Sequence, residues 1–125
     1  MINENFLHFI WKFQLFDFSD LKDTNQVDIH VLKQGVHNHN AGPDFLNARV
    51  KVDDLLWCGD VEIHVKSSDW YAHKHQLDTN YNSVVLHVVY ENDKEVKDSS
   101  GAFLVCLELK NRIPEKYISE YQSLY

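Results

Sequence analysis

Residues 45–66 carry the pattern that most restricts the fold of this chain. Apolar and polar side chains alternate along 45–52 and again along 55–66, and Asp53 and Asp54 separate the two runs. Alternation with a period of two is typical of strands that have one face in the core, and an acidic pair between two such runs is typical of a tight turn. The sequence therefore predicts an antiparallel hairpin around which the rest of the chain must pack.

Further elements are expected on both sides of this hairpin. Apolar residues recur at three- and four-residue steps between residues 5 and 16, which predicts an amphipathic helix. The other expected elements are a strand at 27–33 ending near Gly35, a short helix after Ser67 and Ser68, a doubly covered strand at 83–91, a strand at 102–109 and a helix opened by Pro114. This order predicts an α/β (α+β) fold in which helices flank a central mixed sheet.

Length and composition narrow the class of protein. With 125 residues, of which 44% are apolar, the chain is expected to form a single domain over residues 1–125. The net charge of −7 gives no general attraction to phosphate, so a nucleic-acid partner would need a local basic patch or bridging cations. The longest apolar run is too short to span a bilayer and no cleavable leader precedes it, so we expect a soluble cytoplasmic protein with no membrane contact.

Cys58 and Cys106 are isolated in the sequence, without a C-x-x-C spacing. Such cysteines are typical of packing thiols in a reducing compartment and do not predict a disulfide framework. A zinc site built from cysteine is therefore not expected.

The second strand of the hairpin carries the main candidate site. Glu62, His64 and Lys66 are two residues apart, so a strand places them on one face at intervals of roughly 6.5 to 7 Å. Pairing that is symmetric about the turn brings Asp44 opposite His64 or one residue away. An acid that faces a row of acid, imidazole and amine predicts a site for a divalent cation and a bound water.

The residue types in this row suggest both a metal and a role for the amine. Two carboxylates alone favour Mg²⁺, whereas an imidazole shifts the preference toward Mn²⁺, Fe²⁺ or Zn²⁺. Lys66 could position or deprotonate the water, or neutralise charge on a phosphoryl group. The alternative is that the row is the solvated face of a half-exposed sheet, stabilised by cross-strand charge pairs.

Other histidines lie near this row in the sequence. His87 is the only polar side chain inside an apolar run, so it is either a core histidine with a partner or an inward-facing member of the same site, because an unpaired buried polar group costs roughly 1 to 3 kcal/mol. His73 and His75 can both be ligands only if they stand in a loop, since residues two apart face different sides of a helix. His37 lies in the loop before the hairpin and is a further candidate. His8 and His30 are expected to be structural.

Asp69, Trp70 and Tyr71 follow the row directly. Two large aromatic side chains beside a carboxylate either belong to the core or form a stacking wall for a base or a sugar. Asp69 and Trp70 are therefore additional candidates for the site.

Four blocks of the sequence resemble one known family. They are AGPDFLNARV, GDVEIHVKSSDW, the pattern H-x-H-x-x-D-x-x-Y from His73 to Tyr81, and VVLHVVYEND. Together they resemble a bacterial family of uncharacterised proteins, domain of unknown function 2851, from the first helix to about Lys110. Members of that family are usually longer, so the resemblance implies the N-terminal part of a longer architecture. The family brings no assigned activity.

A second resemblance is to the PD-(D/E)xK nuclease superfamily, whose core runs helix, three strands, helix, strand. Pro43 and Asp44 stand at the start of the second strand, and Lys66 ends the third. The resemblance implies that Asp44 and Glu62 are metal ligands, that His64 is a third ligand or a base, and that Lys66 orients the water. The chain departs from the pattern because a histidine, not an acid, stands two residues before the lysine.

Three functions agree with these residues. The first is a hydrolase of nuclease-like fold that depends on Mg²⁺, Mn²⁺ or Zn²⁺ and acts on a phosphodiester, with nucleic acid as its partner. The second is a non-catalytic binding or assembly module that presents Trp70, Tyr71, His73 and His75 to a partner, to another copy in a homo-oligomer or to a C-terminal part of the chain. The third is a structural zinc-binding domain.

Overall fold

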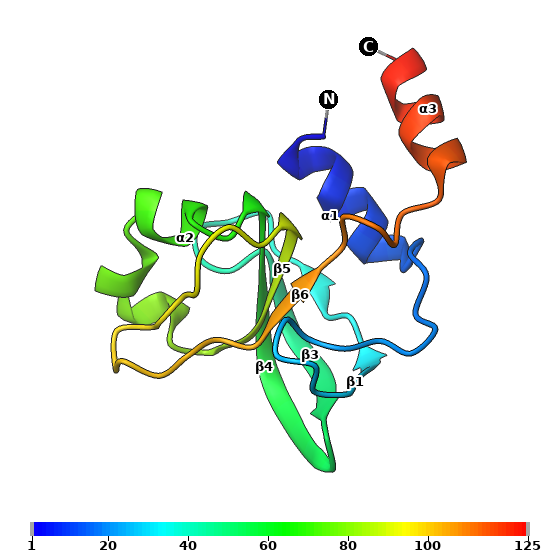
Figure 1. Ribbon diagram of the computed structural model, residues 1–125. Helices are drawn as coiled ribbons and strands as arrows, with labels where there is room; N and C mark the ends of the chain where they lie inside the picture. Colours follow the sequence, from blue (N-terminus) through cyan, green and yellow to red (C-terminus); the bar gives the residue numbers. More distant parts are fainter. Residues whose placement is uncertain (1, 125) are drawn as a thin grey trace.

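The structure is a computed structural model that describes residues 2–124 of the chain. A mixed six-stranded sheet lies at its centre in the order β1-β3-β4-β5-β6, and β2 pairs with β3 (Figure 1). The strands and helices in chain order are α1 (Glu4–Phe13), β1 (Ile29–Lys33), β2 (Val36–His37), β3 (Phe45–Val52), β4 (Leu55–Lys66), α2 (Asp69–Ala72), η1 (His75–Leu77), η2 (Thr79–Tyr81), β5 (Val84–Glu91), β6 (Cys106–Glu108) and α3 (Glu115–Ser123). The predicted α+β class, with helices flanking a mixed sheet, is confirmed.

Strands β3 and β4 form the antiparallel hairpin that the alternation predicts. Val52 pairs with Leu55 across the turn, and Asp53 adopts a left-handed φ of 52° there. Aspartate reaches this conformation more readily than most residues because its short polar side chain can bond locally to the backbone. The two acidic residues therefore end one strand and start the next.

A β-bulge at Asn47 interrupts the regular alternation of β3. Phe45 pairs with Val61, whereas every pair from Ala48 onward follows a register that differs by one residue. Asn47 has a φ of 60°, in the left-handed region that asparagine tolerates. The bulge turns Phe45 into the core and shifts Asp44 by one residue relative to β4, a change that alternation alone does not predict.

The segment between β4 and β5 connects two parallel strands. It contains α2, η1 and η2, and it crosses over one face of the sheet because parallel neighbours cannot be joined by a tight turn. Glu62 on β4 pairs with His87 on β5, so the two side chains lie on the same face. Strand β6 adds a second parallel pair beside β5.

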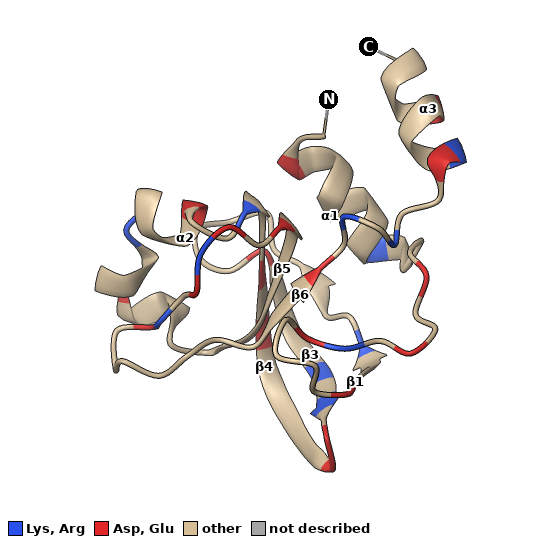
Figure 2. Ribbon diagram, viewed as in Figure 1, with Lys and Arg blue, Asp and Glu red and all other residues tan. Residues whose placement is uncertain are grey.

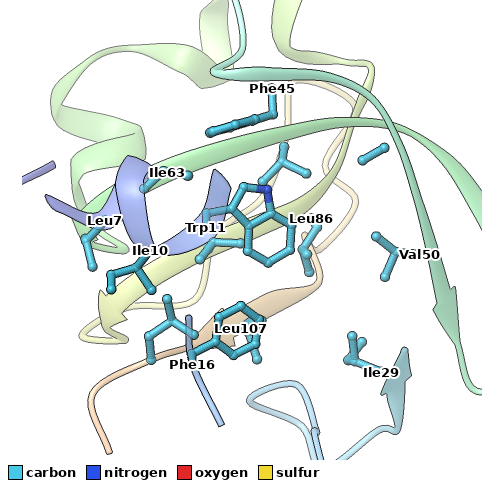
Figure 3. Packing of buried hydrophobic residues seen from close by; sticks show 14 of the residues in the cluster. Leu7, Ile10, Trp11, Phe16, Ile29, Phe45, Val50, Ile63, Leu86 and Leu107 are labelled. Atoms are coloured by element: carbon cyan, nitrogen blue, oxygen red, sulfur yellow. The ribbon is translucent and has the colours of Figure 1, made fainter. Parts of the chain in front are cut away.

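Helix α1 covers the opposite face of the sheet. Its buried residues Leu7, Ile10 and Trp11 pack with Phe45 and Ile63 in the main core cluster (Figure 3). Trp11 lies in the middle of the view, between the helix and the strands. The side chains that point away from the candidate row on β4 are therefore those that build the apolar core.

The first helix is shorter than its apolar periodicity predicts. It follows Asn3, whose side chain accepts a hydrogen bond from the Phe6 N–H, and it ends at Gln14, which has a φ of 53°. The expected span was 5–16. Phe16 lies outside the helix but remains buried, stacked on an indole of the helix, so its place in the apolar pattern reflects burial and not helical geometry.

A second apolar cluster lies beneath the crossover segment. It consists of Trp70, Val84 and Val96, all of which are buried. The crossover also covers the face of β4 that carries Glu62, which is 4% exposed, and His64, which is 0% exposed. The alternative in which this row is a solvated sheet face is therefore wrong.

The C-terminal elements differ in detail from the expected ones. The strand predicted at 102–109 is reduced to Cys106–Glu108, and an isolated bridge joins Phe103 to Lys97. The final helix begins directly after Pro114, as predicted. Within residues 2–124, no helix is both long enough and apolar enough to cross a membrane.

Candidate functional site

The candidate site begins with two neighbouring strands that present histidines to the same space. His64 lies on β4 and His87 on β5, and the two rings approach each other edge to face. His64 Nδ1 is 2.8 Å from His87 Nε2, a distance at which one ring donates an N–H to the other. Both rings are buried. His87 is therefore a core histidine that contacts the row directly through His64.

The crossover segment supplies two more histidines from a turn. His73 ends α2, Lys74 has a left-handed φ of 59°, and His75 starts η1. The reversal at Lys74 lets both imidazoles face β4, which a continuous helix would prevent. His64 Nε2 and His73 Nδ1 are 3.2 Å apart, and one nitrogen from each of the three rings, His64, His73 and His75, lies within 4.8 Å of the others.

A buried carboxyl group adjoins this histidine triad. Glu62 Oε2 lies 2.8 Å from His75 Nε2 and 3.3 Å from His64 Nε2. In spite of the short distance, His75 Nε2 has no hydrogen-bond partner within the described part of the chain. The two atoms are thus close but not aligned for a hydrogen bond, as is expected when both face a common third position.

Asp44 lies beside Glu62, as the first hypothesis requires. Its backbone N–H is 3.2 Å from Glu62 Oε1, and its Oδ2 accepts a hydrogen bond of 2.8 Å from the Ile63 N–H. His8 from α1 reaches the same oxygen, with its Nε2 at 3.4 Å. The sequence predicted a structural role for His8. Only its place as a polar residue within an apolar helical stripe could have indicated that it contacts the site.

The pKa values of the two carboxyl groups shift in opposite directions. Burial, followed by the charge of Asp44, raises the pKa of Glu62 well above its usual range. Burial would also raise the pKa of Asp44, but the nearby His8 imidazole, the Glu62 carboxyl group and the hydrogen bond from the Ile63 N–H lower it. Glu62 therefore keeps its proton beside an ionised Asp44, and the pair carries a negative charge that no lysine or arginine among the described ion pairs neutralises.

The buried histidines are held in their neutral form. Burial and the neighbouring imidazoles lower the pKa of His64 to about 2 and that of His75 to about 4, and burial lowers the pKa of His87 to about 3. A neutral imidazole has a lone pair free on one ring nitrogen. At neutral pH these rings can therefore act as metal ligands without first losing a proton.

Aromatic rings fix the orientation of His75. Tyr81 stacks on it with ring centroids 3.8 Å apart, and Trp70 meets it edge to face at 5.2 Å. Burial and the nearby charge of Glu62 raise the pKa of Tyr81 to about 12, so its hydroxyl stays protonated. Trp70 is fully buried, which confirms the core interpretation and rules out its presentation to a base or a partner.

Three candidates lie outside this cluster. Lys66 is exposed at the end of β4, and its ammonium takes part in no ion pair or hydrogen bond among the described residues. Asp69 accepts a hydrogen bond from the backbone of Lys66. His37 stacks on Phe45 at 4.9 Å and meets His8 at 5.2 Å, so it extends the α1 side of the site.

The fold and the site define an α+β domain in which a crossover segment closes a buried carboxyl–histidine cluster against a mixed sheet. Residues 4–125 match the family model DUF2851, described as a protein of unknown function, and the chain belongs to this family. Comparison with curated proteins gave no match. Comparison with solved structures gave none either.

Proposed function

We propose that this domain binds one divalent transition-metal ion through His64, His73 and His75 and that the site carries out hydrolysis. The observation that supports this most strongly is the convergence of three imidazole nitrogens within 4.8 Å beside a buried carboxyl group. Ligands about 2.0 to 2.1 Å from a tetrahedral ion lie roughly 3.3 to 3.4 Å from one another. The separation of 3.2 Å between His64 Nε2 and His73 Nδ1 agrees with that geometry.

The chemistry of the donors favours zinc or a similar ion over magnesium. Imidazole nitrogen is a ligand for Zn²⁺, Fe²⁺ and Mn²⁺, whereas Mg²⁺ prefers carboxylates and water. The shared negative charge of Asp44 and Glu62 also attracts a cation into a space that burial keeps from bulk water. A cation there would lower the pKa of Glu62 and release its proton.

The number of histidines favours a catalytic site over a structural one. Structural zinc sites are closed by four protein ligands, whereas catalytic sites use three and leave a position for water. Glu62 lies against two of the three rings, where its carboxylate could accept a proton from such a water. His87 forms a hydrogen bond with His64 Nδ1 and so orients His64 Nε2 toward the proposed ion.

A phosphodiester is the bond that we propose is cleaved. The support is the adjacent acid pair Asp44 and Glu62, with His64 two residues further along the same strand, an arrangement similar to the acids and base of the nuclease superfamily. Lys66 follows on the same face at the exposed end of the strand, where its charge could meet a phosphoryl oxygen. This last role rests on strand alternation.

The proposal is tested with metal-loaded protein and two chromogenic substrates, bis(p-nitrophenyl) phosphate and p-nitrophenyl acetate. Glu62→Gln should retain one bound Zn²⁺ per chain but reduce kcat by at least about 100-fold, the lower range for a lost general base. His30→Ala, at an exposed histidine on β1, is the matched control and should leave kcat unchanged. Wild-type protein that binds zinc but hydrolyses neither substrate would contradict the hydrolytic part and favour a structural site.

A further inference from the structure

Three cationic side chains on β1 and β3 form a surface outside the candidate site. We call Lys33, Arg49 and Lys51 the basic strip. Lys33 pairs with Arg49 across the two strands. Among the described residues, the ion pairs that involve lysine or arginine are those of Lys22 and Lys110, so none of the three cations of the strip forms one. Figure 2 shows these blue segments side by side on β1 and β3. Such a group of unpaired cations is unexpected in a chain with a net charge of −7.

The basic strip lies on the same face of the sheet as the histidine triad. Arg49 pairs with Cys58 and Lys51 pairs with Leu56, both on β4. Even-numbered residues of β4 share one face, and this row continues to Glu62. Four residues of strand separate Cys58 from Glu62, which is about 13 Å. The strip therefore lies on the same face of β4 as the site, with Asp60 between Cys58 and Glu62.

A pocket of about 660 Å³ opens along this strip. Lys33, Arg49 and Cys58 line it together with Asn47 and Val36. Val36 is 71% exposed, so the pocket offers an apolar contact next to its cations. Charge and apolar surface side by side suit a ligand that has both anionic and apolar parts.

Asp60 and Asp28, two acids near the strip, have partners of their own. Asp60 accepts hydrogen bonds from the Asn47 N–H at 3.0 Å and from the Ser83 hydroxyl at 2.5 Å. Asp28 is paired with Lys22 at 2.6 Å. Since the cations of the strip form no ion pair among the described residues, they can act on an external anion.

We propose that the basic strip and its pocket bind the phosphate backbone of an extended single strand of nucleic acid and lead it to the histidine triad. This inference rests on the proposed phosphodiesterase function and names its substrate class. Alternate residues such as Arg49 and Lys51 are about 6.5 Å apart along β3, comparable with the spacing of consecutive phosphates in an extended strand. The exposed side chains of Val36 and Leu56 offer contacts to unstacked bases.

Fluorescence anisotropy with a labelled single-stranded DNA oligonucleotide tests this assignment. The double variant Arg49→Ala/Lys51→Ala should weaken binding at least about tenfold at low salt and reduce the slope of log K against log salt by about 1.4. The charge-matched control Lys12→Ala/Lys116→Ala removes two exposed cations from α1 and α3 and should change binding less than twofold. Equal losses in both variants would overturn the assignment to the strip.

Cys58 provides a second, independent readout. It is exposed within the strip, although the sequence suggested a packing thiol, while Cys106 is buried and burial raises its pKa to about 12. A thiol reagent should therefore modify Cys58 alone, and the oligonucleotide should slow that reaction. Unchanged reactivity under saturating oligonucleotide would contradict the proposal.

Two further experiments distinguish failure of this inference from failure of the proposed function. Duplex DNA of the same sequence should bind more weakly than the single strand, and equal or tighter duplex binding would overturn the choice of substrate. Zinc titration of the strip variant should match that of the wild type. Zinc bound without oligonucleotide binding would reject the strip and leave the metal site standing, whereas no zinc binding would reject the site itself.

Discussion

At the scale of single residues, His87 decides which nitrogen His64 offers to the site. The two rings share one hydrogen bond of 2.8 Å, and only the form in which His64 Nδ1 carries the proton leaves its Nε2 lone pair free. The other nitrogen of His87 is buried and has no partner among the described residues. His87 is therefore a positioning residue and not a ligand.

Replacing His87 tests this positioning role. His87→Phe removes the acceptor and should weaken zinc binding by about 10 to 100-fold, the usual effect of losing a partner of a metal-bound histidine. His87→Gln retains an acceptor oxygen and should recover part of the affinity. Competition with a chromogenic chelator measures both, and equal affinities for the two variants would contradict the role.

The buried titratable groups predict how the stability of the metal-free protein depends on pH. The native pKa values of His64, His75 and His87 lie between about 2 and about 4, below the usual 6.5. As pH falls below 6.5 the unfolded chain takes up protons that the native state does not, so stability decreases. Glu62 has the opposite sign: its raised pKa means that the native state keeps a proton that the unfolded state loses above pH 4.5, so stability decreases as pH rises.

The expected result is a maximum of stability near neutral pH. Each proton difference changes the free energy of unfolding by about 1.4 kcal/mol per pH unit, and three histidines outweigh one glutamate on the acid side. Urea unfolding of chelator-treated protein between pH 5 and pH 9 measures this. Glu62→Gln should remove the decline above pH 7 and make the loss of stability on the acid side steeper, because Glu62 no longer opposes the histidines there. An unaltered alkaline decline would show that another group causes it.

Sequence alone predicts part of this site. The row of Glu62 and His64 and the nearness of Asp44 follow from strand alternation and hairpin symmetry. The contribution of His73 and His75 depends on the left-handed conformation of Lys74, which no local sequence preference indicates. His8 enters the site only through the packing of α1, a tertiary event that periodicity does not describe.

At the scale of elements, the bulge at Asn47 sets the register that joins the two acids. It shifts the start of β3 so that the Asp44 carboxylate accepts from the Ile63 N–H. Alternation predicted both strands of the hairpin and their turn, but it could not reveal an extra residue in one strand. Strand β2 was also missed because two residues are too few to show a period.

Substitution of Asn47 tests the role of the bulge. Asn47→Gly should keep the left-handed backbone and change the free energy of unfolding by less than about 1 kcal/mol. Asn47→Val places a β-branched residue at a φ of 60° and should cost roughly 1 to 2 kcal/mol. Because the register of Asp44 depends on the bulge, the valine variant should also bind zinc more weakly. Urea midpoints and zinc titration together check both effects.

At the scale of the whole molecule, the apolar core and the histidine cluster lie on opposite faces of the sheet. The main cluster joins α1 to one face, and the smaller cluster around Trp70 shares the other face with the site. The overall order of elements could be predicted because the core pattern is local, whereas the coverage of the polar row could not, because it depends on the path of the crossover.

This separation predicts that the fold survives loss of the metal. Chelation should lower Tm without abolishing cooperative unfolding, since the main core does not include the ligands. Zinc at 100 times its Kd should stabilise the protein by about 2.7 kcal/mol. Differential scanning calorimetry with and without a chelator measures this, and unfolding at room temperature on chelation would indicate a structural zinc domain.

The most direct test of the metal site is calorimetric titration of Zn²⁺, Mn²⁺ and Mg²⁺ into chelator-treated wild-type protein, His73→Ala and His30→Ala. Both histidines are exposed, so neither variant should disturb the fold. We expect one zinc ion per chain, weak or no binding of Mg²⁺, a loss of zinc affinity of more than about 100-fold in His73→Ala, and no change in His30→Ala. Equal zinc affinity in all three proteins, or no binding to the wild type, would contradict the assignment of the triad as a metal site.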